Sequence, residues 1–288
     1  MIAHADDAGM LRRCVQHHLR IGVENVFVSL NLDDEPSRRV AEELASQNVR
    51  FARVQDFAHD ALDYFTAAKE LVTGWTDPEW LIFLDSDEFW IPKHGDIHDT
   101  AMLSETDAFS VRRFNAPPLR GADGKIGEIR AADPSVLVVG ARQDMDAAFL
   151  AAHPDAPWIN ARIAPKLCAR ANVVATVGLG AHDFEPRLPD YRRAIPDDLL
   201  IVHVPFTTEE RFRRKVRSIR AMLATHGHRF QAGQGWHWRR WLTIEDAGTL
   251  SDEFEAQVLD ERAVAELVSS GVLVTPSELF ENHHLSRE

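Results

Sequence analysis

The chain has 288 residues, 45% of them hydrophobic, which is enough to bury a substantial core in one large domain or two small ones. Its formal net charge of −13 argues against a general nucleic-acid binder. Two cysteines are too few for a disulfide framework, and no secretory signal or transmembrane-length apolar run is visible. We therefore expect a cytoplasmic protein without an intrinsic transmembrane segment, either free or peripheral to a membrane.

The first hundred residues alternate between strand-like apolar runs and helical spacing of apolar residues. Strand-like runs occupy residues 25–31, 49–54 and 80–84, and a short apolar start precedes them. Helical patterns lie between these runs, with the last of them extending from about residue 60 to residue 74. Such alternation predicts an α/β fold with a mainly parallel central sheet and helices on both faces.

The stretch "WLIFLDSDEFW", residues 80–90, runs from an apolar strand directly into three carboxylates within four positions. In an open parallel sheet, ligands bind beyond the carboxyl ends of the strands. Adjacent carboxylates at such a place repel one another and need a compensating positive charge. Mg²⁺ and Mn²⁺ prefer oxygen ligands, so Asp85 and Asp87 are predicted to bind a divalent metal together with a nucleotide diphosphate.

Two other interpretations of this stretch remain open. Acidic residues can simply form the turn after a strand, and Asp-x-Asp alone is a weak pattern. Haloacid-dehalogenase phosphatases also place Asp-x-Asp after an apolar strand, with the first Asp as nucleophile. Those enzymes usually have the motif near the N-terminus and Thr or Val two places after the second Asp, where this chain has Phe89. The difference weakens the phosphatase interpretation.

Three stretches together resemble the glycosyltransferase family 2 type of GT-A enzymes: "HHLRIGVENVFVSLNLDDEP", "WLIFLDSDEFW" and "IVHVPFTTEERFRRKV". The resemblance extends, unevenly, from about residue 2 to about residue 255. It implies a GT-A fold, a nucleotide-sugar donor, a divalent metal (Mn²⁺ or Mg²⁺) and transfer of a sugar to an acceptor.

The resemblance also implies roles for particular residues. Asp85 and Asp87 match the motif that binds the metal and the diphosphate. Asn31 and Asp34 match the stretch after the second strand that holds the nucleoside. Asp7, together with Asp6, occupies a place where relatives usually show Asn-Glu, so its contact with the donor base departs from the family pattern.

The second half of the chain contains further β-like pieces without a clean linker. The predicted division is a nucleotide-sugar-binding half at 1–110, an acceptor-side half at 111–206 that completes the sheet, and a helical C-terminal extension at 207–288, all within one continuous domain. Residues 251–271 are predicted to form one amphipathic helix. Thr207, Thr208 and Glu210 indicate the start of another helix, whose basic residues mostly lie on a solvated face.

Several polar residues of this half are candidates for the site. His182 is predicted to complete the metal site, because neutral imidazole is a good ligand, whereas His203 lies inside an apolar strand and is predicted to be a core residue. Lys166 is predicted to contact the donor. Asp183 is predicted to be the general base that takes the acceptor's proton, with Glu185 as an alternative.

Three tryptophans stand close together in "GQGWHWRRW", residues 233–241. Trp238 and Trp241 are predicted to pack the C-terminal extension onto the core, while the roles of Trp236 and His237 remain open.

The predicted function is a metal-dependent glycosyltransferase that acts on a nucleotide sugar, with a glycan or a lipid- or protein-linked acceptor. The family resemblance favours inversion at the anomeric carbon. Two alternatives remain: a phosphatase of the haloacid-dehalogenase kind, and a non-catalytic nucleotide-sugar-binding protein.

Overall fold

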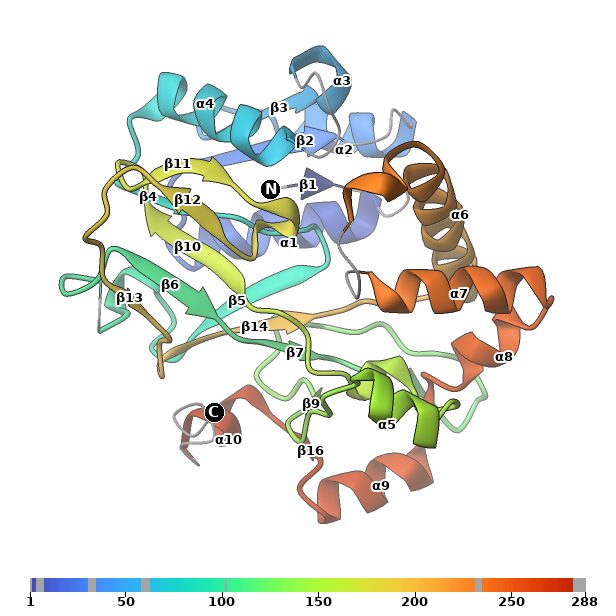
Figure 1. The fold of residues 1–288 in the computed structure, drawn as a ribbon. Helices are drawn as coiled ribbons and strands as arrows, with labels where there is room; N and C mark the ends of the chain where they lie inside the picture. Colours follow the sequence, from blue (N-terminus) through green and yellow to red (C-terminus); the bar gives the residue numbers. More distant parts are fainter. Residues whose placement is uncertain are drawn as a thin grey trace.

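A computed structural model describes residues 2–3, 8–30, 35–57, 63–101, 103–230 and 235–281, with residues 2 and 3 described by their backbone only. Figure 1 shows the path of the chain, coloured from the N-terminus to the C-terminus. The described residues form a mixed α/β structure with several small sheets.

The N-terminal part confirms the predicted alternation of strands and helices. Three strands pair in parallel in the order β1-β2-β3, and helices connect them. Apolar residues of the helices α1 and α2 pack with those of the sheet in one buried cluster. The elements are β1 (Ile2–Ala3), α1 (Ala8–Arg20), β2 (Val26–Leu30), α2 (Glu35–Leu44) and β3 (Val49–Arg53).

The next strand, β4 (Trp80–Ile82), does not continue this sheet. It pairs antiparallel with β10 (Lys166–Arg170) and lies at the end of a second sheet, in the order β13-β6-β10-β4. The other members are β6 (Ala108–Val111) and β13 (Arg193–Ala194). The prediction of a mainly parallel central sheet was therefore wrong for the described residues. A continuous apolar run indicates that a strand is buried, but it does not indicate whether the neighbouring strand is parallel or antiparallel.

A third sheet brings the end of the Asp-x-Asp stretch next to a strand from far along the chain. Its order is β5-β14-β7, with β5 (Glu88–Pro92) antiparallel and β7 (Arg113–Asn115) parallel to β14 (Leu199–His203). The register places His203 opposite Glu88 on one side and opposite Asn115 on the other. Apolar side chains of all three strands belong to the largest buried cluster.

Short strand pairs fasten the remaining segments. β11 (Val174–Val177) pairs with β12 (Phe184–Pro186), and the other two pairs tie the C-terminal segment to the middle of the chain. These two pairs are β15 (Leu259–Asp260) with β8 (Leu119–Arg120), and β16 (Leu273–Val274) with β9 (Val138–Val139).

The C-terminal part is helical and has its own aromatic-rich cluster. Helices α6, α7 and α8 contact one another, and Figure 1 shows them at one side of the strands. Thr208 caps α6 by accepting a hydrogen bond from the Arg211 amide, which confirms the predicted helix start. The helices are α6 (Glu209–His226), α7 (Trp236–Asp246), α8 (Leu250–Glu255), α9 (Glu261–Ser269) and α10 (Pro276–Glu281).

The single helix predicted over residues 251–271 was wrong, because the chain leaves helical geometry between α8 and α9. The buried Gln257 side chain accepts a hydrogen bond from the Ile159 amide, and the Leu259 amide donates to Pro118. Both partners lie about 100 or more positions away in the sequence, so no local pattern indicates the break.

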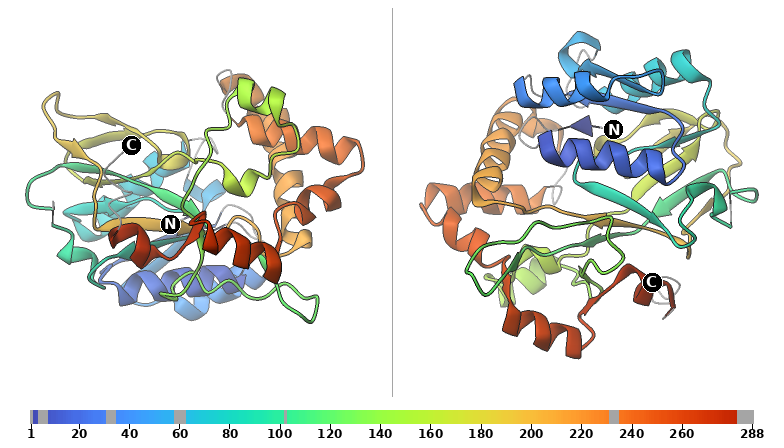
Figure 2. Two further views of the ribbon diagram at one scale, coloured as in Figure 1. Left: turned by 90° about the horizontal axis from the view of Figure 1, so that it is seen from below. Right: turned by 180° about the vertical axis from the view of Figure 1, so that it is seen from behind.

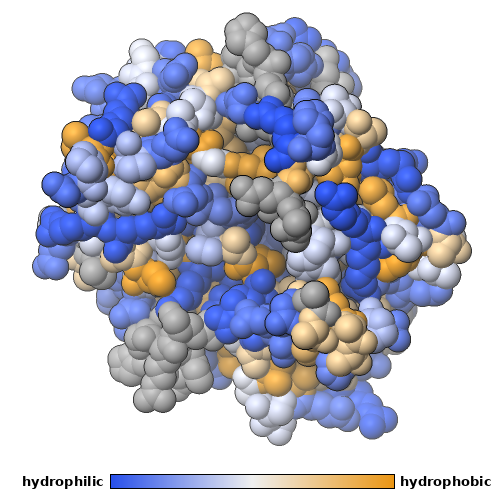
Figure 3. All heavy atoms as spheres, viewed as in Figure 1, coloured by the Kyte–Doolittle hydropathy of each residue, from blue (hydrophilic) through white to orange (hydrophobic). Residues whose placement is uncertain are grey.

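The remaining helices are α3 (Val54–Phe57), α4 (Tyr64–Thr76) and α5 (Ala147–Ala152). Single turns of 3₁₀ helix occur at Ile97–Asp99, Trp158–Asn160, Leu179–Ala181 and Gly227–Arg229. The helices α1 and α4 lie on opposite sides of β2, as Figures 1 and 2 show. On the face seen in Figure 1, hydrophilic side chains cover most of the surface, and apolar atoms occur in separate groups (Figure 3).

Candidate functional site

The candidate site is built around the turn between β4 and β5. The apolar residues Phe83 and Leu84 are buried, and the chain then turns through Asp85, Ser86 and Asp87. Asp85 is half-buried, whereas Ser86 and Asp87 are 1% and 3% exposed. The strand therefore delivers its carboxylates into the protein and not onto an open surface.

Glu88, at the start of β5, is fully buried and holds this turn together. Its Oε1 accepts a hydrogen bond from Arg113 Nη1 at 2.6 Å, and its Oε2 accepts one from the Asp85 amide at 2.9 Å. Lys166 Nζ lies 3.4 Å from Oε2. Burial raises the pKa of Glu88, and the positive charge of Lys166 opposes that shift. Both carboxylate oxygens are thus occupied by the protein, which assigns Glu88 a structural role.

Asp87 lies between helix α6 and strand β14. Its Oδ2 accepts a hydrogen bond from Arg211 Nη2 at 2.9 Å, and Lys215 Nζ lies 3.8 Å from the same oxygen. Its other oxygen, Oδ1, lies 3.8 Å from His203 Nε2. Asp87 therefore faces two cations on one side and an imidazole on the other.

The hydrogen bonds around His203 determine which of its nitrogens carries the proton. Asn115 Nδ2 donates to the Ile159 carbonyl at 2.9 Å, so its Oδ1 is the atom that faces His203 Nδ1 at 2.8 Å. An amide oxygen can only accept, hence Nδ1 carries the proton and Nε2 presents a lone pair toward Asp87. Burial holds the pKa of His203 well below its usual value, which keeps the ring neutral.

Asp85 lies on the other side of the turn with Lys166 and His182. Lys166, 1% exposed, donates from Nζ to Asp85 Oδ2 at 3.0 Å. His182 Nδ1 donates to the Pro165 carbonyl at 2.7 Å, which leaves Nε2 as an acceptor. Burial, and next the positive charge of Arg113, lowers the pKa of His182 to about 3. The predicted residues Asp85, Lys166 and His182 are thus brought into one neighbourhood.

Asp183 is in a different environment from the buried carboxylates. It is exposed, and its Oδ1 accepts hydrogen bonds from Arg193 Nη1 at 2.6 Å and from the Phe184 amide. Partial burial would raise its pKa, but these hydrogen bonds outweigh that effect, and the pKa of Asp183 lies below its usual value. A lowered pKa weakens a carboxylate as a base. Glu185, the alternative, accepts a hydrogen bond from the Thr176 hydroxyl.

Three residues predicted to contact the donor, Asp7, Asn31 and Asp34, lie outside the described residues, as does Asp6. Their assignments stay predictions.

The sequence reasoning missed several members of the site. His203 was predicted to be a core residue and is indeed buried and bonded to Asn115, but its apolar strand did not indicate that its Nε2 also faces Asp87. Arg211 and Lys215 belong to the basic helix that was expected to be mostly solvated; Arg213 and Arg214 are indeed 44% and 40% exposed, whereas Arg211 is buried. Arg211 and Lys215 are four positions apart, so both lie on one face of α6. This spacing is the feature of the sequence that could have indicated their shared role.

The residues around Asp87 determine which ligands a divalent metal could find there. No group of three or more His, Cys, Asp or Glu side chains suited to a metal occurs within the described ranges. Asp87 Oδ1 and the lone pair of His203 Nε2 nevertheless face each other without a proton between them. Mg²⁺ typically takes one or two protein carboxylates and completes its shell with substrate phosphates and water. Asp87 and His203 would therefore supply two ligands to such a metal, and the remainder would have to come from substrate and water.

The charge around the three carboxylates also suits an anionic ligand. Asp85, Asp87 and Glu88 are surrounded by the cations Lys166, Arg113, Arg211 and Lys215. Arginine and lysine bind phosphate oxygens through charge-assisted hydrogen bonds. The four cations outnumber the three carboxylates, and a metal-bound diphosphate carries the negative charge that would balance this excess.

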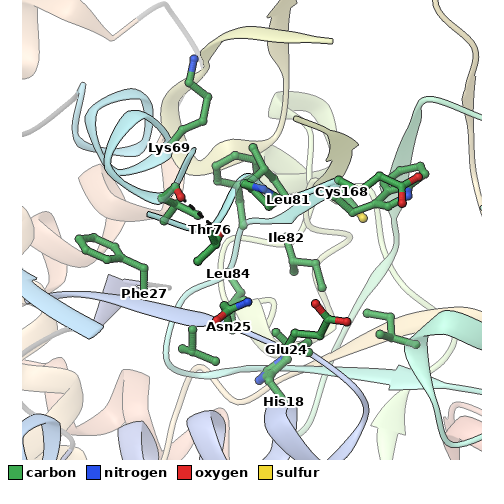
Figure 4. Close-up of a pocket in the computed structure, with 18 of the residues that line it drawn as sticks. His18, Glu24, Asn25, Phe27, Lys69, Thr76, Leu81, Ile82, Leu84 and Cys168 are labelled. Carbon is green, nitrogen blue, oxygen red and sulfur yellow. Dashed lines mark hydrogen bonds between the residues drawn. The ribbon is translucent and has the colours of Figure 1, made fainter. Parts of the chain in front are cut away.

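A separate cavity of about 530 Å³ lies beside this site, between β2 and β4. Figure 4 shows side chains of α1, β2, α4 and β4 around it, among them His18, Phe27, Leu81 and Ile82. None of the site carboxylates lines it.

Of the comparisons with known proteins, only the one with solved structures gave a match. No family model matches the sequence, and no curated protein matches it. Among solved structures, 17 chains match. One is 4-diphosphocytidyl-2C-methyl-D-erythritol synthase from Anaerococcus prevotii, with 12% identity and a TM-score of 0.28 over 46% of this chain and 63% of that chain. The alignment thus spans less than two thirds of that synthase. The chain therefore has a distant structural similarity to this enzyme.

Proposed function

We propose that the protein is a glycosyltransferase that uses a nucleotide-diphosphate sugar as donor, with a divalent metal at the turn between β4 and β5. The observation that carries the proposal is the arrangement at Asp87, where a carboxylate oxygen faces the unprotonated Nε2 of His203 while Arg211 and Lys215 lie beside the other oxygen. The resemblance of the "WLIFLDSDEFW" stretch to GT-A enzymes supports it.

In this proposal Asp87 and His203 would hold the metal, and Asp85 and His182, which neighbour Lys166, would be the further candidates for ligands. When bound, the metal would neutralise the charge of the departing diphosphate. Lys215, half-buried, and Lys166 would contact phosphate oxygens. The buried hydroxyl of Ser86, in the same turn, has no hydrogen-bond partner in the described part of the chain and would donate to a substrate oxygen.

The acceptor's hydroxyl must lose a proton as the anomeric carbon is attacked, if the reaction inverts. We propose Asp183 for this step. Asp183 forms an ion pair with Arg193 in the structure, so the acceptor would have to compete with Arg193 for this carboxylate.

A thermal-shift experiment with UDP, GDP, ADP and CDP, each with and without Mn²⁺, tests the proposal. A ligand at a hundred times its dissociation constant should add about 2.7 kcal/mol of stability. The expected result is stabilisation by one nucleotide that requires the metal and disappears in Asp87→Asn and in His203→Gln. Shifts are measured against each variant's own ligand-free melting temperature, with the exposed Asp190→Asn as control.

The nucleotide identified in this way then defines the donor for a transfer assay. Sugar transfer or slow donor hydrolysis would support an enzyme, whereas binding without turnover would point to a non-catalytic binding protein. Absence of a shift with every nucleotide would contradict the proposal, and phosphatase assays on Asp85→Asn would follow.

A further inference from the structure

The first turn of α7 carries aromatic side chains to which the proposed function assigns no role. Trp241, further along the helix, is 1% exposed and packs in the aromatic-rich cluster, where its ring contacts Phe206. Trp236, His237 and Trp238 are only half-buried. Figure 1 shows this end of α7 directed toward the strands. Packing of the C-terminal part therefore uses Trp241 and leaves the beginning of α7 partly open.

A row of aromatic rings connects this turn with the candidate site. The ring of His203, whose Nε2 faces Asp87, lies 6.2 Å from the ring of Trp158, measured between centroids. The Trp158 ring, 4% exposed, lies 5.3 Å from the ring of His237. The His237 ring in turn lies 5.5 Å from that of Trp236. The row therefore leads from a buried carboxylate to rings that are partly exposed.

The charges around His237 place it at the same site. Burial, and next the positive charges of Lys215 and Arg113, lower the pKa of His237 to about 3. Lys215 Nζ lies 3.8 Å from Asp87 Oδ2, and Arg113 donates to Glu88. The same cations thus act on His237 and on the site carboxylates, so the first turn of α7 borders the candidate site.

The His237 ring has no hydrogen-bond partner in the described part of the chain. Its neighbours there are the rings of Trp158, Trp236, Trp238 and Trp241. A neutral imidazole has one donor and one acceptor nitrogen, and such groups in a protein normally find a partner in the protein, in water or in a ligand. His237 therefore offers a donor and an acceptor beside an indole ring.

A sugar ring matches this combination. Its C–H groups can pack against the negative face of an indole, and its hydroxyls can both donate and accept hydrogen bonds. In a nucleotide-diphosphate sugar the carbon that is attacked is bonded to the diphosphate, so the acceptor must lie close to the residues that hold the metal. The row of rings begins at one of these residues, His203.

We propose that Trp236 and His237 bind a sugar ring of a carbohydrate acceptor, with the indole of Trp236 stacked on the ring and the nitrogens of His237 hydrogen-bonded to its hydroxyls. The inference rests on the proposed function, because it names the class of acceptor for that same site.

The test measures binding of the full chain to an array of immobilised neutral oligosaccharides, with and without the nucleotide and Mn²⁺ that stabilise the protein. Wild type should bind oligosaccharides that share a terminal sugar. Trp236→Ala removes the stacking face and should weaken this binding about tenfold. Trp75→Ala is the matched control, because Trp75 is a half-buried tryptophan of α4 beside Arg50, and it should bind as wild type does.

His237→Phe provides a second variant in case Trp236→Ala does not fold. It keeps an aromatic ring among the tryptophans and removes only the two nitrogens, so it should weaken binding about fivefold through the lost hydrogen bond. Wild-type binding in both variants would overturn the proposal, and so would the absence of binding to every oligosaccharide on the array.

Nucleotide binding separates this inference from the proposed function. The metal-dependent thermal shift should persist in Trp236→Ala, because the diphosphate is held elsewhere. A shift that is present in wild type and lost in Trp236→Ala would show that the indole stacks on the nucleobase, which would overturn the inference and leave the proposed function intact. Absence of any shift in wild type would contradict the proposed function, whereas array binding that still depends on Trp236 would support the sugar site.

Discussion

Asp85, Asp87 and Glu88 are three acids within four positions, and their surroundings give them different properties. Glu88 is enclosed by Arg113, Lys166 and the Asp85 amide, so it organises the turn. Asp87 is buried but keeps one oxygen facing an unprotonated imidazole nitrogen. Asp85 is half-buried and meets Lys166. The groups that surround each carboxylate, and not its residue type, therefore decide what it can do chemically.

The ion pair between Asp87 and Arg211 predicts a large loss of stability in Asp87→Asn. Both side chains are 5% exposed, and removing one partner of a buried pair leaves an uncompensated charge. The free energy of unfolding should fall by about 3 kcal/mol, measured by urea denaturation.

Asp183→Asn is the matched comparison, because Asp183 pairs with Arg193 while its side chain is 73% exposed. Exposed ion pairs contribute about 0.2 to 1 kcal/mol, so this variant should lose no more than that. Equal losses in the two variants would contradict the structural distinction between the two carboxylates.

Among the helices, α6 has the closest connection to the site. It carries Arg211 and Lys215 on the face that meets Asp87, and Phe212, Val216 and Ile219 in the aromatic-rich cluster. Its start is set by the Thr208 cap, just after β14 delivers His203. One connection of a few residues therefore positions an imidazole and two cations around a single carboxylate.

Thr208→Ala removes the side-chain acceptor of the Arg211 amide at the start of α6. Loss of an N-cap lowers stability by about 1 kcal/mol, which denaturant unfolding should detect. The control is Thr225→Ala, in the last turn of the same helix, where the exposed hydroxyl donates to the Ala221 carbonyl. A loss in Thr225→Ala equal to that in Thr208→Ala would show that the cap is not the cause.

For the molecule as a whole, several buried imidazoles predict that stability declines in mild acid. Burial lowers the pKa values of His18, His182 and His237 to about 3. The unfolded chain takes up protons below pH about 6.5, whereas these rings stay neutral in the folded protein until pH about 3. The neutral histidines therefore contribute stability above pH about 6.5, and this contribution is lost progressively as the pH falls below that value.

His18 offers a specific test of this pH dependence. Its Nδ1 donates to the Cys14 carbonyl at 2.7 Å and its Nε2 faces the Trp90 amide at 3.4 Å, so a second proton would meet a donor. Replacing His18 by Gln should reduce the pH dependence of the unfolding free energy between pH 7 and pH 5, by up to about 1.4 kcal/mol per unit. The exposed His94→Gln should retain the wild-type dependence; an identical dependence in all three proteins would contradict the assignment.

No helix in the described ranges is long and apolar enough to cross a membrane. In the described ranges, buried apolar residues form four clusters, three of which join segments from distant parts of the chain, while the fourth lies within residues 8–51. The C-terminal helices, for example, share their cluster with Trp158 and Phe206.

The sequence alone determined the alternation of strands and helices in the described part of the first eighty residues, apart from the short helix α3, together with the Thr208 helix start and the acidic strand end, because burial and capping leave local patterns. Only the tertiary structure decided that β4 pairs antiparallel with β10, and that Lys166 and Arg211 meet Asp85 and Asp87 from 81 and 124 positions away. It alone reveals that Asn115 turns the lone pair of His203 toward Asp87. The direction of a neighbouring strand and the partner of a buried charge depend on contacts between distant segments, and such contacts leave no periodic trace in the sequence.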